Sequence, residues 1–151
     1  MSIVSLVLSA ITMSISVYLF FQRRFSIKVN RQHTYLATIS HKTLHVLITV
    51  TNKSSLPISI IDSKLNNIYL HRKKNLVYTN SRDNQIIDKI YTSTFPINIE
   101  PYESVDIRLQ FNSETEFNFV NYQLTLYTPR GTYHVTLLKQ FMSDNYTNIE
   151  L

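Results

Sequence analysis

The chain has 151 residues, no cysteine and a single glycine, which excludes disulfides, thiolate metal sites, cysteine nucleophiles and most glycine-built phosphate loops. Its 44% hydrophobic residues, with ten Tyr and eight Phe, are enough for one domain with a core of its own. The net charge of +5 is unevenly spread, since twelve of the 15 Lys and Arg precede Tyr91 and seven of the 10 acidic residues follow Ile90. Such an asymmetry either orients the chain against a negative surface or is simply a solvated face.

The first predicted element is a transmembrane anchor over residues 1–22. Residues 2–21 carry no charged side chain, and Gln22-Arg23-Arg24 follow them. As a helix, residues 3–21 span about 28 Å, close to the ~30 Å of bilayer hydrocarbon. Five Ser and Thr residues interrupt the apolar run, but their hydroxyls can bond to carbonyls of the preceding turn. We therefore expect a single-pass protein of the cell membrane, with the lipid bilayer as its first partner.

Two other interpretations of this apolar run are weaker. A cleavable signal peptide has a basic start, a shorter apolar stretch and a small-residue cleavage site, whereas no Lys or Arg precedes this run and it ends in SVYLFFQRR. A buried helix of a soluble domain would be apolar on all sides, within a chain whose remainder has strand-like periodicity. Ser5 and Ser9 have the spacing that lets two membrane helices approach closely.

The orientation of the anchor is predicted from the basic residues that follow it, Arg23, Arg24, Lys28 and Arg31. An excess of Lys and Arg marks the cytoplasmic side of a membrane, so we expect the N-terminus outside and the C-terminal domain in the cytoplasm. The same four side chains are candidate membrane-surface residues, in contact with anionic lipid headgroups. Residues 23–31 are thus predicted to form a basic juxtamembrane segment and the first strand.

Beyond the anchor, apolar residues recur at every second position, which predicts strands rather than helices. The pattern is clearest over residues 44–51 and 105–111, and shorter strands are predicted at 25–29, 58–60, 68–71, 76–79, 120–128 and 132–139. Short strands at this spacing, with no crossover helix, predict an all-β fold in which residues 32–141 form an antiparallel β-sandwich. Its shared core is predicted to contain Val46, Ile48, Val50, Ile60, Ile107, Leu109, Leu124 and Leu126.

Three connecting or terminal segments also carry predictions. Pro129-Arg130-Gly131 predicts a β-hairpin turn, because Pro fixes the first turn position and Gly accepts a positive φ. Residues 83–91, DNQIIDKIY, predict one or two helical turns with Ile86, Ile87 and Ile90 on one side. The polar residues 142–151 are expected to form a flexible tail.

The segments VLITVTNKSSLPISI, FPINIEPYESVDIRLQF and NYQLTLYTPRGTYHVTL resemble the B–C, D–E and F–G portions of immunoglobulin-like domains. Within this resemblance, Tyr122 corresponds to the tyrosine of the E–F corner. The chain is similar to small membrane-anchored immunoglobulin-like proteins of low-GC Gram-positive bacteria and their phages. It lacks the Cys…Trp…Cys core of antibody domains, so the resemblance implies an architecture and carries no site residues.

No catalytic constellation, cofactor motif or metal motif stands out in the chain, and we expect no enzyme activity and no cofactor. His41 and His45 are four positions apart but straddle a turn that enters a strand, so they are better explained as exposed strand-edge residues than as metal ligands. The carboxylates show no paired arrangement that indicates acid–base catalysis.

The one local cationic cluster is Arg72, Lys73 and Lys74, which are candidate anion contacts. Tyr69 and Tyr78 bracket the cluster and could stack on bases, as in proteins that bind single-stranded nucleic acid. A solvated turn between two short strands is the simpler interpretation, and lipid headgroups are the second. Nucleic acid is the weakest of the three.

Together these features predict a non-enzymatic, membrane-tethered β-sandwich that binds a protein partner. One specific form of this hypothesis, from the phage resemblance, is superinfection exclusion, in which a small anchored protein obstructs DNA entry. Two alternatives stay open: a structural or accessory subunit of a membrane complex, and a peripheral binder of nucleic acid or anionic lipid.

Overall fold

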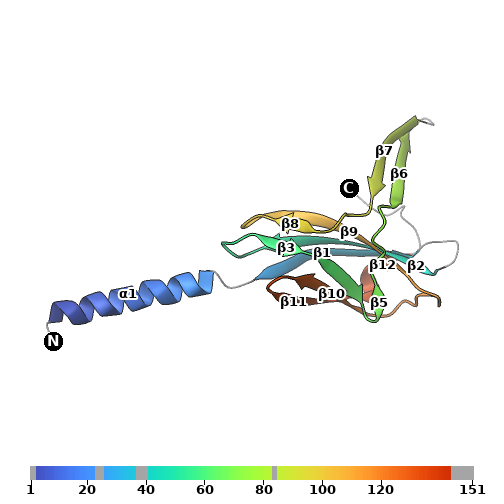
Figure 1. Cartoon of the computed structure of the whole chain (residues 1–151). Helices are drawn as coiled ribbons and strands as arrows, with labels where there is room; N and C mark the ends of the chain where they lie inside the picture. Colours follow the sequence, from blue (N-terminus) through green and yellow to red (C-terminus); the bar gives the residue numbers. More distant parts are fainter. Residues whose placement is uncertain (1–2, 23–25, 37–40, 83–84, 144–151) are drawn as a thin grey trace.

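The computed structural model describes residues 3–22, 26–36, 41–82 and 85–143 (Figure 1). Its first element is the helix α1 (Ile3–Gln22), which is long and apolar enough to cross a membrane. None of its apolar window, Ile3–Phe20, is buried against the rest of the described chain. In Figure 1 the helix extends away from the strands.

The expected bonding of the helix hydroxyls is confirmed at four positions. Ser9 Oγ donates to the Ser5 carbonyl at 2.9 Å, and Thr12 Oγ1 donates to the Leu8 carbonyl at 2.8 Å. Ser14 and Ser16 make the same contact with the carbonyls four residues before them, at 2.9 and 2.8 Å. These polar atoms are therefore satisfied within the helix and add little cost to its transfer into lipid.

The remainder of the described chain is almost entirely strand. In chain order the elements are β1 (Ile27–Leu36), β2 (Thr43–Asn52), β3 (Ile58–Ile60), β4 (Asp62–Leu65), β5 (Ile68–Tyr69), β6 (Leu76–Arg82), β7 (Gln85–Tyr91), β8 (Ile97–Ile99), β9 (Ser104–Asn112), β10 (Tyr122–Thr128), β11 (Gly131–Leu137), the 3-10 turn η1 (Lys139–Phe141) and β12 (Met142–Ser143).

The strands form two four-stranded sheets and two strand pairs. The larger sheets have the orders β12-β1-β2-β9 and β11-β10-β4-β5, and the pairs are β3-β8 and β6-β7. Pairing among the described strands is antiparallel except between β1 and β12, which run parallel. An N-terminal apolar helix followed by antiparallel β-sheet is thus confirmed.

Residues of both larger sheets are buried in one hydrophobic cluster. Strand β2 shows why, because its buried and half-buried residues alternate along its full length. The eight residues predicted to share a core all belong to this cluster, each no more than 1% exposed: Val46, Ile48, Val50, Ile60, Ile107, Leu109, Leu124 and Leu126.

The predicted hairpin between β10 and β11 is also confirmed. Thr128 pairs with Gly131, so only Pro129 and Arg130 lie in the loop. Gly131 has a φ of 139°, a conformation that residues with a Cβ rarely adopt. Thr128 Oγ1 donates to the Gly131 carbonyl at 2.8 Å and closes the turn.

The prediction of helical turns over residues 83–91 is wrong. Gln85–Tyr91 is the strand β7, paired antiparallel with β6 from Leu76↔Tyr91 to Arg82↔Gln85. Three of its seven residues are isoleucine, whose β-branched side chain favours extended backbone, and β6 supplies the hydrogen-bonding partner that no local pattern reveals. Residues 83 and 84 lie outside the described part of the chain.

The C-terminal segment joins the first strand. Met142 and Ser143 open the stretch expected to be a tail, and they form β12 beside Thr34 and Tyr35 of β1. Residues 144–151 lie outside the described part.

A buried amide organises one end of the strands. Asn52, the last residue of β2, is fully buried. Its Nδ2 donates to the Leu56 carbonyl at 2.8 Å and to the carbonyls of Ile99 and Glu100, both at 3.1 Å. Its Oδ1 accepts from the backbone N–H and hydroxyl of Ser54, at 2.9 and 2.6 Å. One side chain therefore joins β2, the turn that follows it and the end of β8.

Asn52→Asp tests this role. The substitution replaces two N–H donors with a carboxylate that faces three carbonyl oxygens, so we expect the free energy of unfolding to fall by about 3 to 5 kcal/mol. Asn98→Asp, on an exposed position of β8, is the matched control and should change it by less than about 0.5 kcal/mol. Urea unfolding of the full chain in detergent micelles, followed by circular dichroism, measures both. Equal midpoints for the two variants would contradict the role of Asn52.

Candidate functional site

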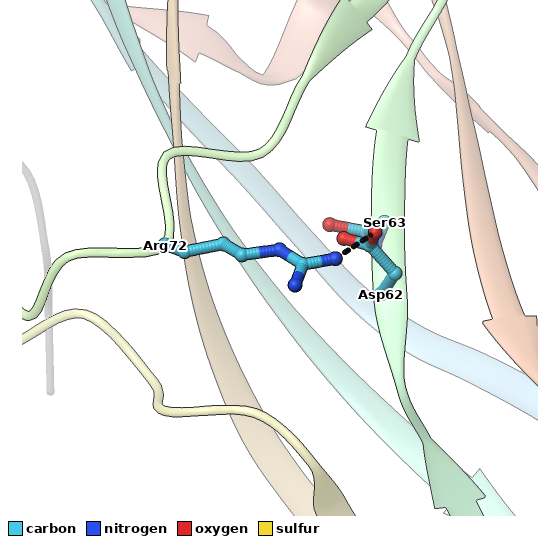
Figure 2. A network of polar contacts seen from close by, with 3 residues as sticks. All are labelled: Asp62, Ser63 and Arg72. Atoms are coloured by element: carbon cyan, nitrogen blue, oxygen red, sulfur yellow. Dashed lines mark hydrogen bonds and ion pairs between the residues drawn. The ribbon is translucent and has the colours of Figure 1, made fainter.

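The predicted cationic cluster lies in the exposed loop between β5 and β6, but its members have separate partners. Nη2 of Arg72 pairs with Oδ2 of Asp62 on β4, as Figure 2 shows. The other carboxylate oxygen of Asp62 accepts the backbone N–H of Ser63 at 2.8 Å. Because 71% of the Arg72 side chain is exposed, this pair adds little stability, but it removes much of the charge that an anion would meet.

The two lysines of the cluster also have different surroundings. Lys74 Nζ lies 4.8 Å from the ring centroid of Tyr91, in a cation–π contact. Lys73 is exposed in the same loop. Lys64 Nζ lies 4.8 Å from the ring centroid of Tyr69, which remains largely exposed, and the side chain of Tyr78 lies outside the described part. Arg72, Lys74 and Tyr69 thus each contact a different residue, namely Asp62, Tyr91 and Lys64.

Lys74 instead borders a cleft of about 440 Å³ at the foot of the β6–β7 hairpin. Figure 1 shows that hairpin standing away from the other strands. The cleft combines two cations, hydroxyl groups and an apolar wall, and it is lined by Lys74, Tyr91, Thr92, Ser93, Thr94, Pro96, Ile97, Val105, Asp106 and Arg108.

The charges of the cleft favour an anionic ligand. Lys74 and Arg108 have no acidic side chain within 4.0 Å among the side chains that the structure describes. The one acidic lining residue, Asp106, accepts the hydroxyl of Thr49 at 2.6 Å. Two cations without ion partners on one cleft can hold a carboxylate or a phosphate, with neighbouring hydroxyls as further donors.

Backbone contacts hold the wall of this cleft against β9. Ser93 N donates to the Arg108 carbonyl at 2.8 Å, and Arg108 N donates to Ser93 Oγ at 2.9 Å. Asn75 N donates to Thr92 Oγ1 at 3.0 Å, and Thr92 N donates to the Asn75 carbonyl at 2.9 Å. Asn75 Nδ2 also donates to Gln110 Oε1 at 2.9 Å. The segment that carries the hydroxyls is therefore fixed before any ligand binds, which lowers the entropic cost of binding.

Sequence reasoning missed Arg108 and the segment that includes Ser93. Arg108 has the outward position expected of a charged residue in an alternating strand, and nothing local distinguishes it. Its neighbourhood arises from the pairing with Ser93, fifteen residues earlier in the chain.

The predicted membrane-surface residues are only partly described. Lys28 and Arg31 are exposed on β1, whereas Arg23 and Arg24 lie outside the described residues. Within the searched part of the chain, no three His, Asp or Glu side chains are grouped so that they could hold a metal ion.

The expectation that His45 is an exposed strand-edge residue is wrong, because β2 lies between β1 and β9. His45 is half-buried on the face of β2 opposite the core, paired with Tyr35 of β1 and Gln110 of β9. Burial lowers its pKa from 6.5 to about 4. Burial, with the charge of Arg31, also lowers the pKa of His33, and burial raises the pKa of Tyr35. This face thus favours the neutral forms of all three side chains.

No protein-family model matches the chain, and no curated protein sequence matches it. The resemblance to immunoglobulin-like domains therefore stays a prediction.

The lowered pKa of the half-buried His45 predicts that the stability of the protein depends on pH. Between pH 6.5 and about 4, His45 takes up a proton in the unfolded chain but not in the folded one, so its contribution is complete above pH 6.5 and is lost as the pH falls toward 4. The glutamine in His45→Gln cannot titrate. When the pH falls from 7 to 4.5, we therefore expect the free energy of unfolding of the parent to decrease by about 2 kcal/mol more than that of His45→Gln. Urea unfolding at a series of pH values measures the difference. Parallel profiles for the two proteins would exclude His45 as the cause.

Proposed function

We propose that the protein is a non-enzymatic binding module tethered to the cell membrane by α1. The observation that carries this proposal is the exposed helix. Its apolar window is unburied, and the hydrophobic cluster of the strands contains no residue of α1. The strands therefore fold around a core of their own, and a bilayer is the environment that removes the helix side chains from water.

For the strands we propose an immunoglobulin-like β-sandwich, with the two four-stranded sheets facing each other. Their common hydrophobic cluster supports this arrangement. The corner before β10 supports it too, because Tyr122 Oη donates to the Asn118 carbonyl at 3.1 Å and accepts the Asn118 N–H at 3.0 Å. A tyrosine hydroxyl that bonds back to the preceding backbone is typical of that corner.

For the binding surface we propose the cleft at the foot of the β6–β7 hairpin. Lys74 and Arg108 would meet an acidic group of a protein partner there, and the hairpin would extend the contact. The hairpin strands pair only with each other among the described strands, so their outer edges are open to a further strand. Charged clefts fixed in advance favour selective partners over general adhesion.

A crosslinking experiment tests this surface. A photo-reactive residue placed at Thr94, an exposed lining position, should give a discrete protein adduct in cells. Lys74→Glu should reduce the yield about tenfold, since removal of one charge-assisted contact costs roughly 1.4 kcal/mol or more. Lys73→Glu makes the same charge change in the same loop, outside the cleft, and should leave the adduct unchanged. Equal yields in the two variants would refute the cleft as the binding surface.

For the orientation we propose a cytoplasmic C-terminal domain, supported by Lys28 and Arg31 and by the two arginines that precede them in the sequence. Because the chain has no cysteine, single substitutions give clean labels. We expect a membrane-impermeant maleimide to label Ser2→Cys in intact cells and Thr136→Cys, on the exposed side of β11, only after permeabilisation. The reverse pattern would invert the orientation. Extraction of the protein by carbonate would instead show that α1 is not a membrane span.

A further inference from the structure

We infer that the end of the strands nearest α1 docks on the bilayer surface, with the exposed ring of Tyr102 among the lipid headgroups and Lys53 at their phosphates. This inference rests on the proposed membrane span and adds a second, peripheral contact with the same membrane. Four observations support it: the length of the connection to α1, the backbone contacts at this end, the position of Tyr102 and the nearby cations.

The connection between the helix and the first strand is short. Helix α1 ends at Gln22 and β1 begins at Ile27. Five Cα steps separate these residues, so even a fully extended connection reaches only about 17 Å. The headgroup region on each side of the hydrocarbon is itself several ångströms deep. The first residues of β1 therefore lie at or close to the headgroups whenever α1 spans the bilayer.

Two turns are fixed to these first residues. Lys53 N donates to the Ser26 carbonyl at 2.9 Å, and Ile27 pairs with Asn52. Asn52 N in turn donates to the Glu103 carbonyl at 2.9 Å. The turn after β2 and the turn between β8 and β9 consequently share the end of the strands where β1 begins. Figure 1 shows both turns on the side that faces α1.

The second of these turns presents Tyr102 to its surroundings. Tyr102 is 64% exposed and has a φ of 62°, an uncommon conformation for a residue with a bulky side chain. The turn is closed by Glu103 N, which donates to the Glu100 carbonyl at 3.1 Å, and by Glu100 N, which donates to Glu103 Oε2 at 2.9 Å. A tyrosine held outward in this way has an apolar ring and a polar hydroxyl, the combination that suits the membrane interface.

The cations at this end complement lipid phosphates. Lys53 is exposed in the first turn, and Lys28 is exposed one residue into β1. The second turn also carries the exposed acidic residues Glu100 and Glu103, and Oε2 of Glu103 accepts the Glu100 N–H at 2.9 Å. Beside these two glutamates, the end therefore offers two lysines and one aromatic ring to a surface that lies within reach of the connection.

The chain contains no tryptophan, so single Tyr→Trp substitutions report on each region separately. Tyr102→Trp probes the proposed contact. Tyr69→Trp is the matched control, since Tyr69 is 73% exposed. It lies on β5, which pairs with β4, at the opposite end of the strands. At that end Leu70 pairs with Phe111, Phe111 pairs with Leu44, and Leu44 pairs with Leu36. Leu36 is the last residue of β1 and lies about 30 Å along that strand from Ile27. Tyr18→Trp, within α1, reports on the span itself.

The full-length variants are reconstituted in phosphatidylcholine–phosphatidylglycerol vesicles, with and without brominated acyl chains. We expect quenching of Tyr18→Trp, and a blue shift with quenching of Tyr102→Trp that exceeds that of Tyr69→Trp by about twofold or more. Adding Lys53→Gln to Tyr102→Trp should lower its quenching, whereas adding Lys73→Gln, a distant exposed lysine, should not. Circular dichroism of each variant checks that the strands are intact.

The outcomes separate the two proposals. Equal quenching of Tyr102→Trp and Tyr69→Trp, with Tyr18→Trp quenched, overturns the docking contact and leaves the span in place. Absence of quenching at Tyr18→Trp overturns the span and the contact that depends on it. Quenching of Tyr102→Trp that is insensitive to Lys53→Gln overturns the phosphate contact of that lysine.

Discussion

The alternation of buried and half-buried residues along β2 is the constraint on which the other strands depend. Strand β2 pairs with β1 on one side and β9 on the other, so its register fixes which side chains of both neighbours enter the core. A slip of one residue would turn every core side chain outward. The strand ends at Asn52, where the side-chain amide replaces the ladder hydrogen bonds with contacts to the following turn and to β8. Apolar periodicity thus determines which side chains enter the core, and one buried amide connects the strands at one end.

Three of the described cations contact a side chain close to them. Arg72 is paired with Asp62, while Lys64 and Lys74 lie over tyrosine rings. A count of basic residues therefore overstates the surface that an anion meets. What distinguishes the cleft is that Lys74 and Arg108 both line it and have no acidic side chain within 4.0 Å among those the structure describes. What distinguishes the end near α1 is its short connection to the helix.

The sequence predicted those parts of the fold whose cause is local. Alternating apolar residues identified the core strands, and Pro129-Arg130-Gly131 identified the hairpin because each residue fits one turn position. Residues 85–91 were misassigned because Ile86, Ile87 and Ile90 fit one face of a helix as well as they fit a strand, and only pairing with β6 decides. The cleft was not predictable, since its wall depends on contacts such as Ser93 with Arg108 between residues that are distant in the chain.

The attachment of α1 next to the start of β1 has a mechanical consequence. A force applied between the membrane and the strands enters through the start of β1 and runs along that strand. Strand β1 is hydrogen-bonded to β2 over most of its length, and to β12 near its far end. Because the bonds of the antiparallel β1–β2 pair are nearly perpendicular to the strand axis, a pull along β1 shears many of them at once instead of opening them one by one. A pull along β1 is therefore resisted by many hydrogen bonds together rather than by the first of them alone.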